Sequence, residues 1–366
     1  MNGAAGEEPL LCWREGPVGR IELNRPQALN ALTFPMVELF IKTLRDWQDD
    51  LAIQVVVVTG AGSRGLCAGG DIRWIHRQLA EDMDEVRRFW RTEYELDALI
   101  ARFPKPYVAI MSGIVMGGGV GIAGHGRHRV VTDTSQVAMP EVGIGFIPDV
   151  GGSRLLARAP GELGTHLALT SQAIGPGDAL GCGMADRFVP ADRISDLVAA
   201  LRREPAPAAL DRFAAPAPPG RLARQAHWIN ECYAGDSVER VVGRLASHPA
   251  QEARAAAEEL GRQPPTALKL ALRLLRQVAR APDLETALAQ EFRVISHCIE
   301  SADFAEGIRA QLIDKDRNPR WAPATLGEVS QDLVDWFFTE QDSASGRYTL
   351  WDCGSVCVED RRSLGI

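Results

Sequence analysis

The amino-acid sequence predicts an α/β fold followed by a helical C-terminal region, and three observations carry that prediction. The run Val55–Val58 is typical of a strand that is buried on both faces of a sheet. Apolar residues in segment 34–50 recur at helical spacing, which predicts an amphipathic helix. Strand-like and helix-like patterns alternate from about residue 17 to about residue 190, as they do in an α/β core.

The strands that we expect in this core are short. The alternating segment 18–23 comes first, and the valine run lies in a strand over 54–59; further strands are expected at 107–111, 128–132 and 136–139. Segment 107–126 carries no formal charge over twenty residues, about the length that spans a bilayer, yet seven of its residues are glycine. We therefore expect a buried strand, a tight turn and the start of a helix there, and no membrane span.

Four regions are expected along the chain. Residues 1–200 form the α/β core, which carries the candidate site, and residues 201–250 form a connection rich in proline and alanine together with a helix. Residues 251–341 form the helical C-terminal region, with helices expected at 251–261, 266–278 and 284–300. Residues 342–366 show no clear pattern, and we expect either a disordered tail or an appendage.

Composition and charge exclude several classes of function. The formal net charge of −8, from 48 acidic and 40 basic residues, disfavours a nucleic acid as the main partner. The seven cysteines are scattered, and residues 1–9 show neither a basic nor an apolar targeting pattern, so we expect reduced thiols and a cytoplasmic location. Cys353 and Cys357 could form a disulfide with each other or hold a metal. No histidine or further cysteine that could complete a metal site lies near them. His125 and His128 lack a nearby carboxylate or thiol, and we expect no metal site.

One dinucleotide-like motif is not supported by its surroundings. Gly60–Gly65 matches the spacing G-x-G-x-x-G and follows the valine strand. That fingerprint requires a helix that opens at the third glycine. The residues that follow, Leu-Cys-Ala-Gly-Gly at 66–70, do not begin a helix. We expect an ordinary loop and no nicotinamide or flavin cofactor.

Two glycine-rich turns are stronger candidates for a functional site. One is Cys67–Asp71, Cys-Ala-Gly-Gly-Asp, and the other is Met116–Gly121, Met-Gly-Gly-Gly-Val-Gly. Two backbone N–H groups that point at one oxygen form an oxyanion hole, and a helix that begins at the second turn adds its dipole. Two flexible loops are the alternative. We expect Asp71 to be structural, fixing its turn or capping a short helix.

These turns belong to a longer ordered set of motifs. Asn24-Arg25-Pro26 and Ala28–Leu32 precede the first turn, and the triple glycine 117–119 follows it. Over about residues 17–200 this order resembles the crotonase (enoyl-CoA hydratase/isomerase) superfamily, whose fold is a ββα spiral. The resemblance implies that an acyl-CoA thioester carbonyl binds between two backbone N–H groups, here those of Gly70 and Gly118. A side chain introduced at Gly118 is then expected to crowd the thioester.

One departure from the family pattern bears on the reaction. Hydratases of the family have a glutamate where this chain has Gly121, so one of the two carboxylates used for water addition is absent. Glu141, in Met-Pro-Glu, matches the second family glutamate, and Asp149 follows eight residues later in Pro-Asp-Val-Gly-Gly. Together with segments 265–269, 303–310 and 312–321, this pair resembles the 3-hydroxyisobutyryl-CoA hydrolases over about residues 17–340.

The resemblance implies hydrolysis of a short β-hydroxyacyl-CoA thioester, with 3-hydroxyisobutyryl-CoA of valine breakdown as the first candidate. Glu141 would attack the carbonyl directly or act as general base to water. Asp149 would orient the substrate hydroxyl or manage a proton, and a turn-capping role is its structural alternative. An enoyl-CoA hydratase, a dienoyl-CoA isomerase and a non-catalytic acyl-CoA-binding protein are the competing interpretations.

The implied partner is the acyl-CoA small molecule, with no dissociable cofactor. Its phosphates need cations. Where the family often has a lysine after Asn-Arg-Pro, this chain has Gln27, so Arg25 and Arg73 are the candidates, together with C-terminal bases that the sequence does not locate. The acyl-chain preference does not follow from the sequence, and a homo-oligomer is compatible with it.

Overall fold

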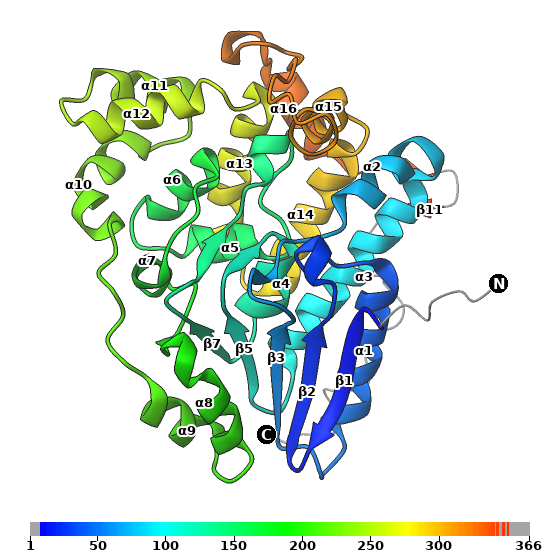
Figure 1. Ribbon diagram of the computed structural model, residues 1–366. Coiled ribbons are helices and arrows are strands. Elements are labelled where there is room, and N and C mark those ends of the chain that lie inside the picture. Colours follow the sequence, from blue (N-terminus) through cyan, green and yellow to red (C-terminus); the bar gives the residue numbers. More distant parts are fainter. Residues whose placement is uncertain (1–7, 341, 344–345, 348–349, 351–366) are drawn as a thin grey trace, which may run out of the picture.

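The core strands of the protein form two sheets, and Figure 1 shows strands of the larger one side by side. The computed structural model describes residues 8–340, 342–343, 346–347 and 350. The larger sheet has the order β1-β2-β3-β5-β7-β9, and its neighbours are parallel except β1 and β2. Its strands are β1 (Leu10–Glu15), β2 (Val18–Leu23), β3 (Val55–Gly60), β5 (Tyr107–Met111), β7 (His128–Val131) and β9 (Arg187–Phe188).

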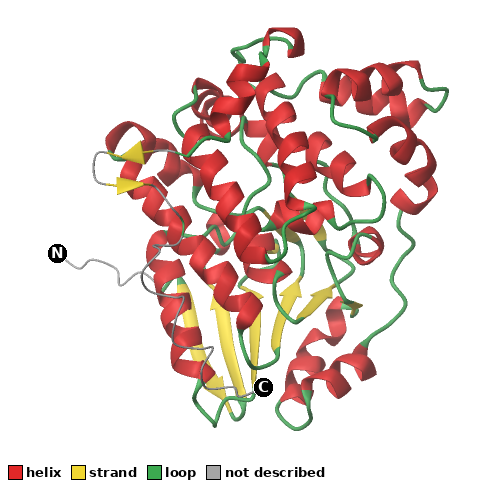
Figure 2. Ribbon diagram, turned by 180° about the vertical axis from the view of Figure 1, so that it is seen from behind, coloured by secondary structure: helices red, strands yellow, loops and turns green. Residues whose placement is uncertain are grey.

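The valine strand is buried on both faces, as expected. Val55 and Val57 pack beneath helices α8 (Ile194–Leu201) and α9 (Ala206–Phe213). Val56 and Val58 point into the main core on the opposite face. From behind, helices cover that opposite face of the sheet (Figure 2). They include α1 (Phe34–Gln48) and α3 (Met83–Arg102).

The smaller sheet carries the candidate site. It contains three parallel strands, β4 (Gly65–Cys67), β6 (Ile114–Met116) and β8 (Gln136–Ala138), in that order. Each one follows a strand of the larger sheet in the chain, so the fold repeats as a two-strand unit. Because the carboxyl ends of parallel strands meet at one edge, the segments that follow these strands converge there. The uncharged segment 107–126 is thus a buried strand, a turn, a second short strand and helix α4 (Gly118–Gly124).

Helices build most of the rest of the chain. The expected helices at 251–261, 266–278 and 284–300 are confirmed as α12, α13 and α14, and α13 begins at Pro265 because proline fits the first helical position. The proline-rich segment 203–220 is an ordered connection that contains α9. The other helices are α2 (Ile72–Glu81), α5 (Gly152–Ala157), α6 (Leu163–Thr170), α7 (Pro176–Gly181), α10 (Leu222–Tyr233), α11 (Val238–Ser247), α12 (Gln251–Leu260), α13 (Pro265–Val278), α14 (Leu284–Cys298), α15 (Ala302–Ile308) and α16 (Gln331–Phe337).

Helix α3 is the most important element that the sequence patterns do not predict. Its inner face buries Arg87, Glu93 and Asp97 among apolar residues, so its hydrophobic period is interrupted by charges. The apolar spacing that would predict a helix is therefore broken where α3 approaches the site. The short strands β4 and β6 and strand β1 are also absent from the sequence-based expectations.

The described part of the C-terminal stretch is small. Strands β10 (Asp342–Ser343) and β11 (Gly346–Arg347) pair antiparallel, and Leu350 is buried. The expectation for the rest of 342–366, with Cys353 and Cys357, lies outside the described residues. The five described cysteines are free thiols. Within the described residues, no helix is both long and apolar enough to cross a membrane.

Candidate active site

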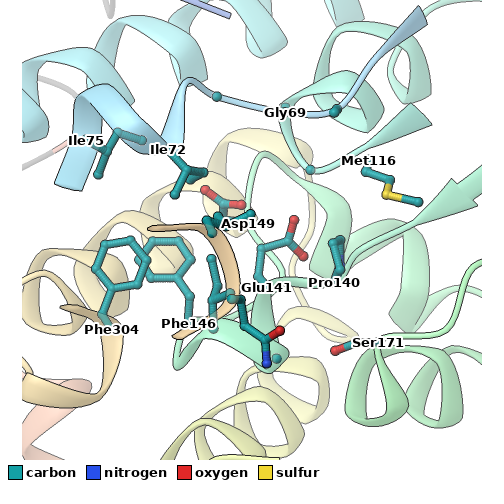
Figure 3. A pocket seen from close by; sticks show the side chains of 18 of the residues that line it. Gly69, Ile72, Ile75, Met116, Pro140, Glu141, Phe146, Asp149, Ser171 and Phe304 are labelled. Carbon is teal, nitrogen blue, oxygen red and sulfur yellow. The ribbon is translucent and has the colours of Figure 1, made fainter. Parts of the chain in front are cut away.

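A cavity of about 990 Å³ opens where the smaller sheet ends (Figure 3). Its floor comes from the segments that follow β4, β6 and β8, and its walls come from α2, α3 and the C-terminal helices. The residues that line it include Ala68, Gly69, Gly70, Ile72, Ile75, Trp90, Glu93, Met116, Gly117, Gly118, Pro140, Glu141, Gly143, Ile144, Phe146, Asp149, Val150, Ser171, Glu259, Arg262, Gln263, Phe304, Gln311, Leu312, Arg317, Pro319 and Trp321.

The two glycine-rich turns lie against each other. Gly69 and Gly117 have φ values of 105° and 51°, which favour glycine. A Cβ on Gly69 would lie 3.5 Å from the Gly118 nitrogen, which shows how close the turns are. Within the described residues neither Gly70 nor Gly118 donates its backbone N–H to another backbone group. Two free donors therefore line the cavity, and Gly118 is also the first residue of α4.

Glu141 lies beside this pair of turns. It begins the short 3-10 helix Glu141–Ile144 directly after β8, and its side chain is 8% exposed. A Cβ on Gly117 would lie 2.8 Å from Glu141 Oε1. Its Oε2 atom is buried without a hydrogen-bond partner. Burial, reinforced by the charge of Asp149, raises the pKa of Glu141 well above its ordinary range.

Asp149 completes a pair of carboxyl groups in the cavity. It is 4% exposed, and the Tyr94 hydroxyl donates a hydrogen bond of 3.1 Å to its Oδ2 atom. Burial raises the pKa of Asp149 to about 7, although the Tyr94 hydrogen bond opposes that rise. Since the two carboxyl groups interact, their protons belong to the pair.

Glu93 is a site residue that sequence reasoning missed. It lines the cavity, is 2% exposed and has a buried, unpartnered Oε1 atom. Burial and the charge of Asp149 raise the pKa of Glu93 well above its ordinary range. A Cβ on Gly118 would overlap this carboxyl oxygen and approach Leu32. Bulk at Gly118 would therefore first meet the Glu93 carboxyl group in the cavity, and its effect on the thioester stays a prediction.

The position of the missing hydratase glutamate is filled by other atoms. A Cβ on Gly121 would lie 2.7 Å from Asp97 Oδ1 and 2.9 Å from Val150 Cβ. Asp97 is fully buried, and both of its carboxyl oxygens lack a hydrogen-bond partner. Burial, with the charges of Glu93, Asp149 and Glu291, raises the pKa of Asp97 well above its ordinary range. No side chain fits at position 121 in this packing.

An apolar wall faces the carboxyl groups. Trp90 stacks on Phe146 with ring centroids 5.2 Å apart, and Phe146 stacks on Phe304 at 4.6 Å. Ile72 and Ile75 of α2 lie beside them (Figure 3). This wall joins residues from four separate parts of the chain and gives the cavity an apolar side opposite its carboxyl groups.

The arginines of the cavity differ from the ones expected for the CoA phosphates. Arg25 is held by Asp71 at 2.8 Å and by the Ala31 carbonyl at 2.6 Å, and Arg73 is exposed on α2. Neither is part of the cavity lining, which contains Arg262 and Arg317. Asp71 accepts a 3.2 Å hydrogen bond from the Trp74 amide, so its capping role is confirmed.

The two histidines His125 and His128 and the G-x-G-x-x-G segment 60–65 lie outside the cavity lining. His125 lies at the end of α4 with its Nε2 atom 2.7 Å from the Val150 carbonyl oxygen, and His128 is on β7. Segment 60–65 is the end of β3, a loop and the start of β4, without a helix. Among the described residues, no group of three or more histidine, cysteine, aspartate or glutamate side chains could hold a metal ion.

The sequence is similar to curated hydrolases over nearly its whole length. It is 39% identical over 353 residues to "3-hydroxyisobutyryl-CoA hydrolase, mitochondrial" of Danio rerio, which covers 93% of this chain and 92% of the relative. The human protein of the same name is 36% identical over 355 residues, with 94% and 92% covered.

Solved structures and a family model agree on the fold. A carnitinyl-CoA dehydratase from Mycobacterium thermoresistibile superposes with a TM-score of 0.89 at 48% identity, covering 92% of this chain and 98% of that one. An enoyl-CoA hydratase from Rhodobacter sphaeroides 2.4.1 has a TM-score of 0.86 at 42% identity, with 90% and 97% covered. The enoyl-CoA hydratase/isomerase family model matches residues 18–338. The chain therefore belongs to the enoyl-CoA hydratase/isomerase family.

Proposed function

We propose that the protein hydrolyses a short β-hydroxyacyl-CoA thioester, with 3-hydroxyisobutyryl-CoA as its substrate and 3-hydroxyisobutyrate and CoA as products. The observation that carries this proposal is the Glu141 carboxyl group beside the Gly70 and Gly118 amides, combined with a packed position 121. One carboxylate at the carbonyl suffices for acyl transfer, and the position from which family hydratases present their second carboxylate is occupied by packing in this chain. The relatives named as 3-hydroxyisobutyryl-CoA hydrolases support the same activity.

In this proposal the thioester oxygen accepts hydrogen bonds from the Gly70 and Gly118 N–H groups. These donors stabilise the negative charge that develops when an oxygen nucleophile adds to the carbonyl carbon. Glu141 either adds directly, giving a mixed anhydride that water then hydrolyses, or removes a proton from the attacking water. In both routes the carbon–sulfur bond breaks. In the water route Glu141 passes the proton taken from water to the departing sulfur; in the direct route CoA leaves as a thiolate, and the water that later hydrolyses the anhydride supplies its proton.

The cavity has separate regions for the parts of the substrate. The wall of Trp90, Phe146 and Phe304 takes the branched carbon skeleton, and Glu93 and Asp149 offer carboxyl groups to the β-hydroxyl. Arg262 and Arg317 are the cations of the lining and are assigned to the CoA phosphates. No cofactor is needed for this chemistry.

A hydratase is the second candidate, because two of the similar structures bear the names dehydratase and hydratase. The two reactions differ in what they release. We expect free thiol from 3-hydroxyisobutyryl-CoA and no loss of double-bond absorbance from crotonyl-CoA or methacrylyl-CoA. Hydration of either enoyl ester without thiol release would overturn the proposal.

The cellular location is a separate proposal. The sequence favours the cytoplasm, whereas the names of the vertebrate relatives include the word mitochondrial. Fractionation of cells that express the natural gene decides between them, and activity confined to an organelle fraction would contradict a cytoplasmic location.

A further inference from the structure

The turn that carries Asp149 contains a backbone conformation that its sequence disfavours. Val150 has a φ of 51°, in the left-handed region, although its side chain is β-branched. It is 1% exposed and lines the cavity directly after Asp149. A conformation of this kind persists where the surroundings hold it, and such positions gather at active sites.

His125 holds the carbonyl of this strained residue. Its Nε2 atom lies 2.7 Å from the Val150 oxygen. A carbonyl oxygen only accepts, so Nε2 carries the hydrogen and the imidazole is the donor. Desolvation lowers the pKa of His125 to about 4, so the ring is neutral at ordinary pH and keeps this tautomer.

The next residue is held from the other side. Glu291, which belongs to α14, accepts a hydrogen bond of 2.7 Å from the Gly151 N–H and another from the Ser153 hydroxyl. Gly151 has a φ of 74°, and a Cβ there would lie 2.5 Å from His125 Nε2. The Gly152 N–H donates to the Asp149 carbonyl at 2.6 Å. Each peptide group of the turn is thus fixed by a named partner.

His125 also belongs to the element that carries the oxyanion donor. It caps the end of α4, whose first residue is Gly118. Midway along α4, Gly121 packs directly on Val150. The His125 ring therefore connects the end of α4 to the turn that places Asp149 in the cavity.

We propose that His125 is a positioning residue, which holds Val150 in the left-handed conformation and thereby fixes the Asp149 carboxyl group relative to the Gly118 amide. The inference rests on the proposed function in one respect, namely the role of Asp149 in turnover. The hydrogen bond from His125 to the Val150 carbonyl, which we call the clamp, is a property of the fold and can be measured without substrate.

A matched pair of variants separates the hydrogen bond from the bulk of the ring. Gln at position 125 places an amide N–H near the position of Nε2, whereas Leu has similar volume and no donor. We expect His125→Leu to lower kcat for 3-hydroxyisobutyryl-CoA by about tenfold to a hundredfold with KM little changed, because a small displacement of a catalytic group costs that much. His125→Gln should restore most of the loss.

The effect should depend on Asp149. In an Asp149→Asn background, His125→Leu should cause no further loss of kcat, because residues that act through one another are not additive. Equal losses in both backgrounds, or equal behaviour of the Gln and Leu variants, would overturn the assignment. If His125→Leu does not fold, His125→Asn replaces it, since its shorter amide does not reach the Val150 oxygen.

Hydrogen exchange tests the clamp independently of activity. The Gly151 and Gly152 amides should exchange faster in His125→Leu and at the wild-type rate in His125→Gln. Unchanged exchange in the Leu variant would refute the clamp. If this exchange pattern is found but no β-hydroxyacyl-CoA is hydrolysed by the wild-type protein, the proposed function fails and the clamp stands.

Discussion

At the scale of single residues, Glu141 carries the proposed chemistry. Glu141→Gln keeps the size of the side chain but removes the negative oxygen, so neither nucleophilic attack nor general-base catalysis can occur. We expect thiol release to fall by about a thousandfold or more, while calorimetric titration still detects binding of the CoA ester. Glu81→Gln, on the exposed face of α2, is the control and should keep full activity. A Glu141→Gln protein that hydrolyses the ester at nearly the wild-type rate would remove Glu141 from the mechanism.

Oxygen-isotope labelling can separate direct attack by Glu141 from general-base catalysis by Glu141. If turnover in heavy-oxygen water places label in the Glu141 carboxyl group, a mixed anhydride has formed and its enzyme-side carbonyl has been attacked. Trapping of an acylated Glu141 by hydroxylamine would identify the same intermediate.

The pH dependence follows from the carboxyl pair. Since burial raises the pKa values of Glu141 and Asp149, the latter to about 7, the pair retains a proton below that pH. Both roles of Glu141 need its ionised form, so kcat/KM should rise with increasing pH in a range well above 4.5, the ordinary pKa of a glutamate.

Tyr94→Phe tests the hydrogen bond to Asp149. The Tyr94 hydroxyl stabilises ionised Asp149, so its removal should raise the pKa of Asp149, which an NMR titration of the Asp149 carboxyl carbon measures. An unchanged or lower pKa of Asp149 would mean that Tyr94 does not stabilise the ionised form.

At the scale of elements, α4 packs too tightly to accept a side chain on its inner face. Gly121→Ala would place a Cβ against Asp97 and Val150, and such overpacking costs about 1–3 kcal/mol of unfolding free energy. Gly243→Ala is the matched control, because nothing lies within 4 Å of a Cβ there and Gly243 is inside α11. It should raise the free energy of unfolding by about 0.5–1 kcal/mol. Urea denaturation of both variants measures the difference, and a stable Gly121→Glu enzyme with hydratase activity would contradict this packing.

At the scale of the whole molecule, buried carboxyl groups make stability depend on pH. Asp97 has a raised pKa in the folded state, so folding takes up a proton at pH values between its ordinary pKa of 3.8 and the raised one. Within this range the free energy of unfolding falls by about 1.4 kcal/mol for each pH unit that the pH rises.

Asp97→Asn removes this dependence, because the amide needs no proton. We expect the free-energy difference between Asp97→Asn and wild type to grow in favour of the variant between pH 5 and pH 7, by at most about 1.4 kcal/mol per pH unit. Urea denaturation at both pH values measures it, with Glu95→Gln, a partly exposed neighbour on the same helix, as the control. A difference that is the same at both pH values would show that Asp97 is not held protonated.

The C-terminal region supplies part of the cavity lining. Phe304 stacks in the apolar wall, Arg262 and Arg317 line the cavity, and Glu291 holds the turn after Asp149. The core of residues 1–200 therefore contains the carboxyl groups of the cavity but not its complete lining.

The amino-acid sequence by itself determined the parts of this protein that depend on neighbours in the chain. The alternating burial of Val55–Val58, the two glycine turns and the capping role of Asp71 are local properties, so residue type and spacing were sufficient to predict them. The motifs around Glu141 and Asp149 were also visible, because each is a short ordered segment at the end of a strand or in a turn.

Only the tertiary structure decided what surrounds those motifs. Glu93 enters the site, and Asp97 packs against Gly121, from a helix whose buried charges interrupt its apolar spacing. Glu291 reaches Gly151 from 140 residues away in the chain. The choice of Arg262 and Arg317 over Arg25 and Arg73 as cavity cations likewise depends on how the C-terminal helices pack. Such contacts join segments that are distant in sequence, and their geometry is fixed by the burial of the whole core rather than by any local pattern.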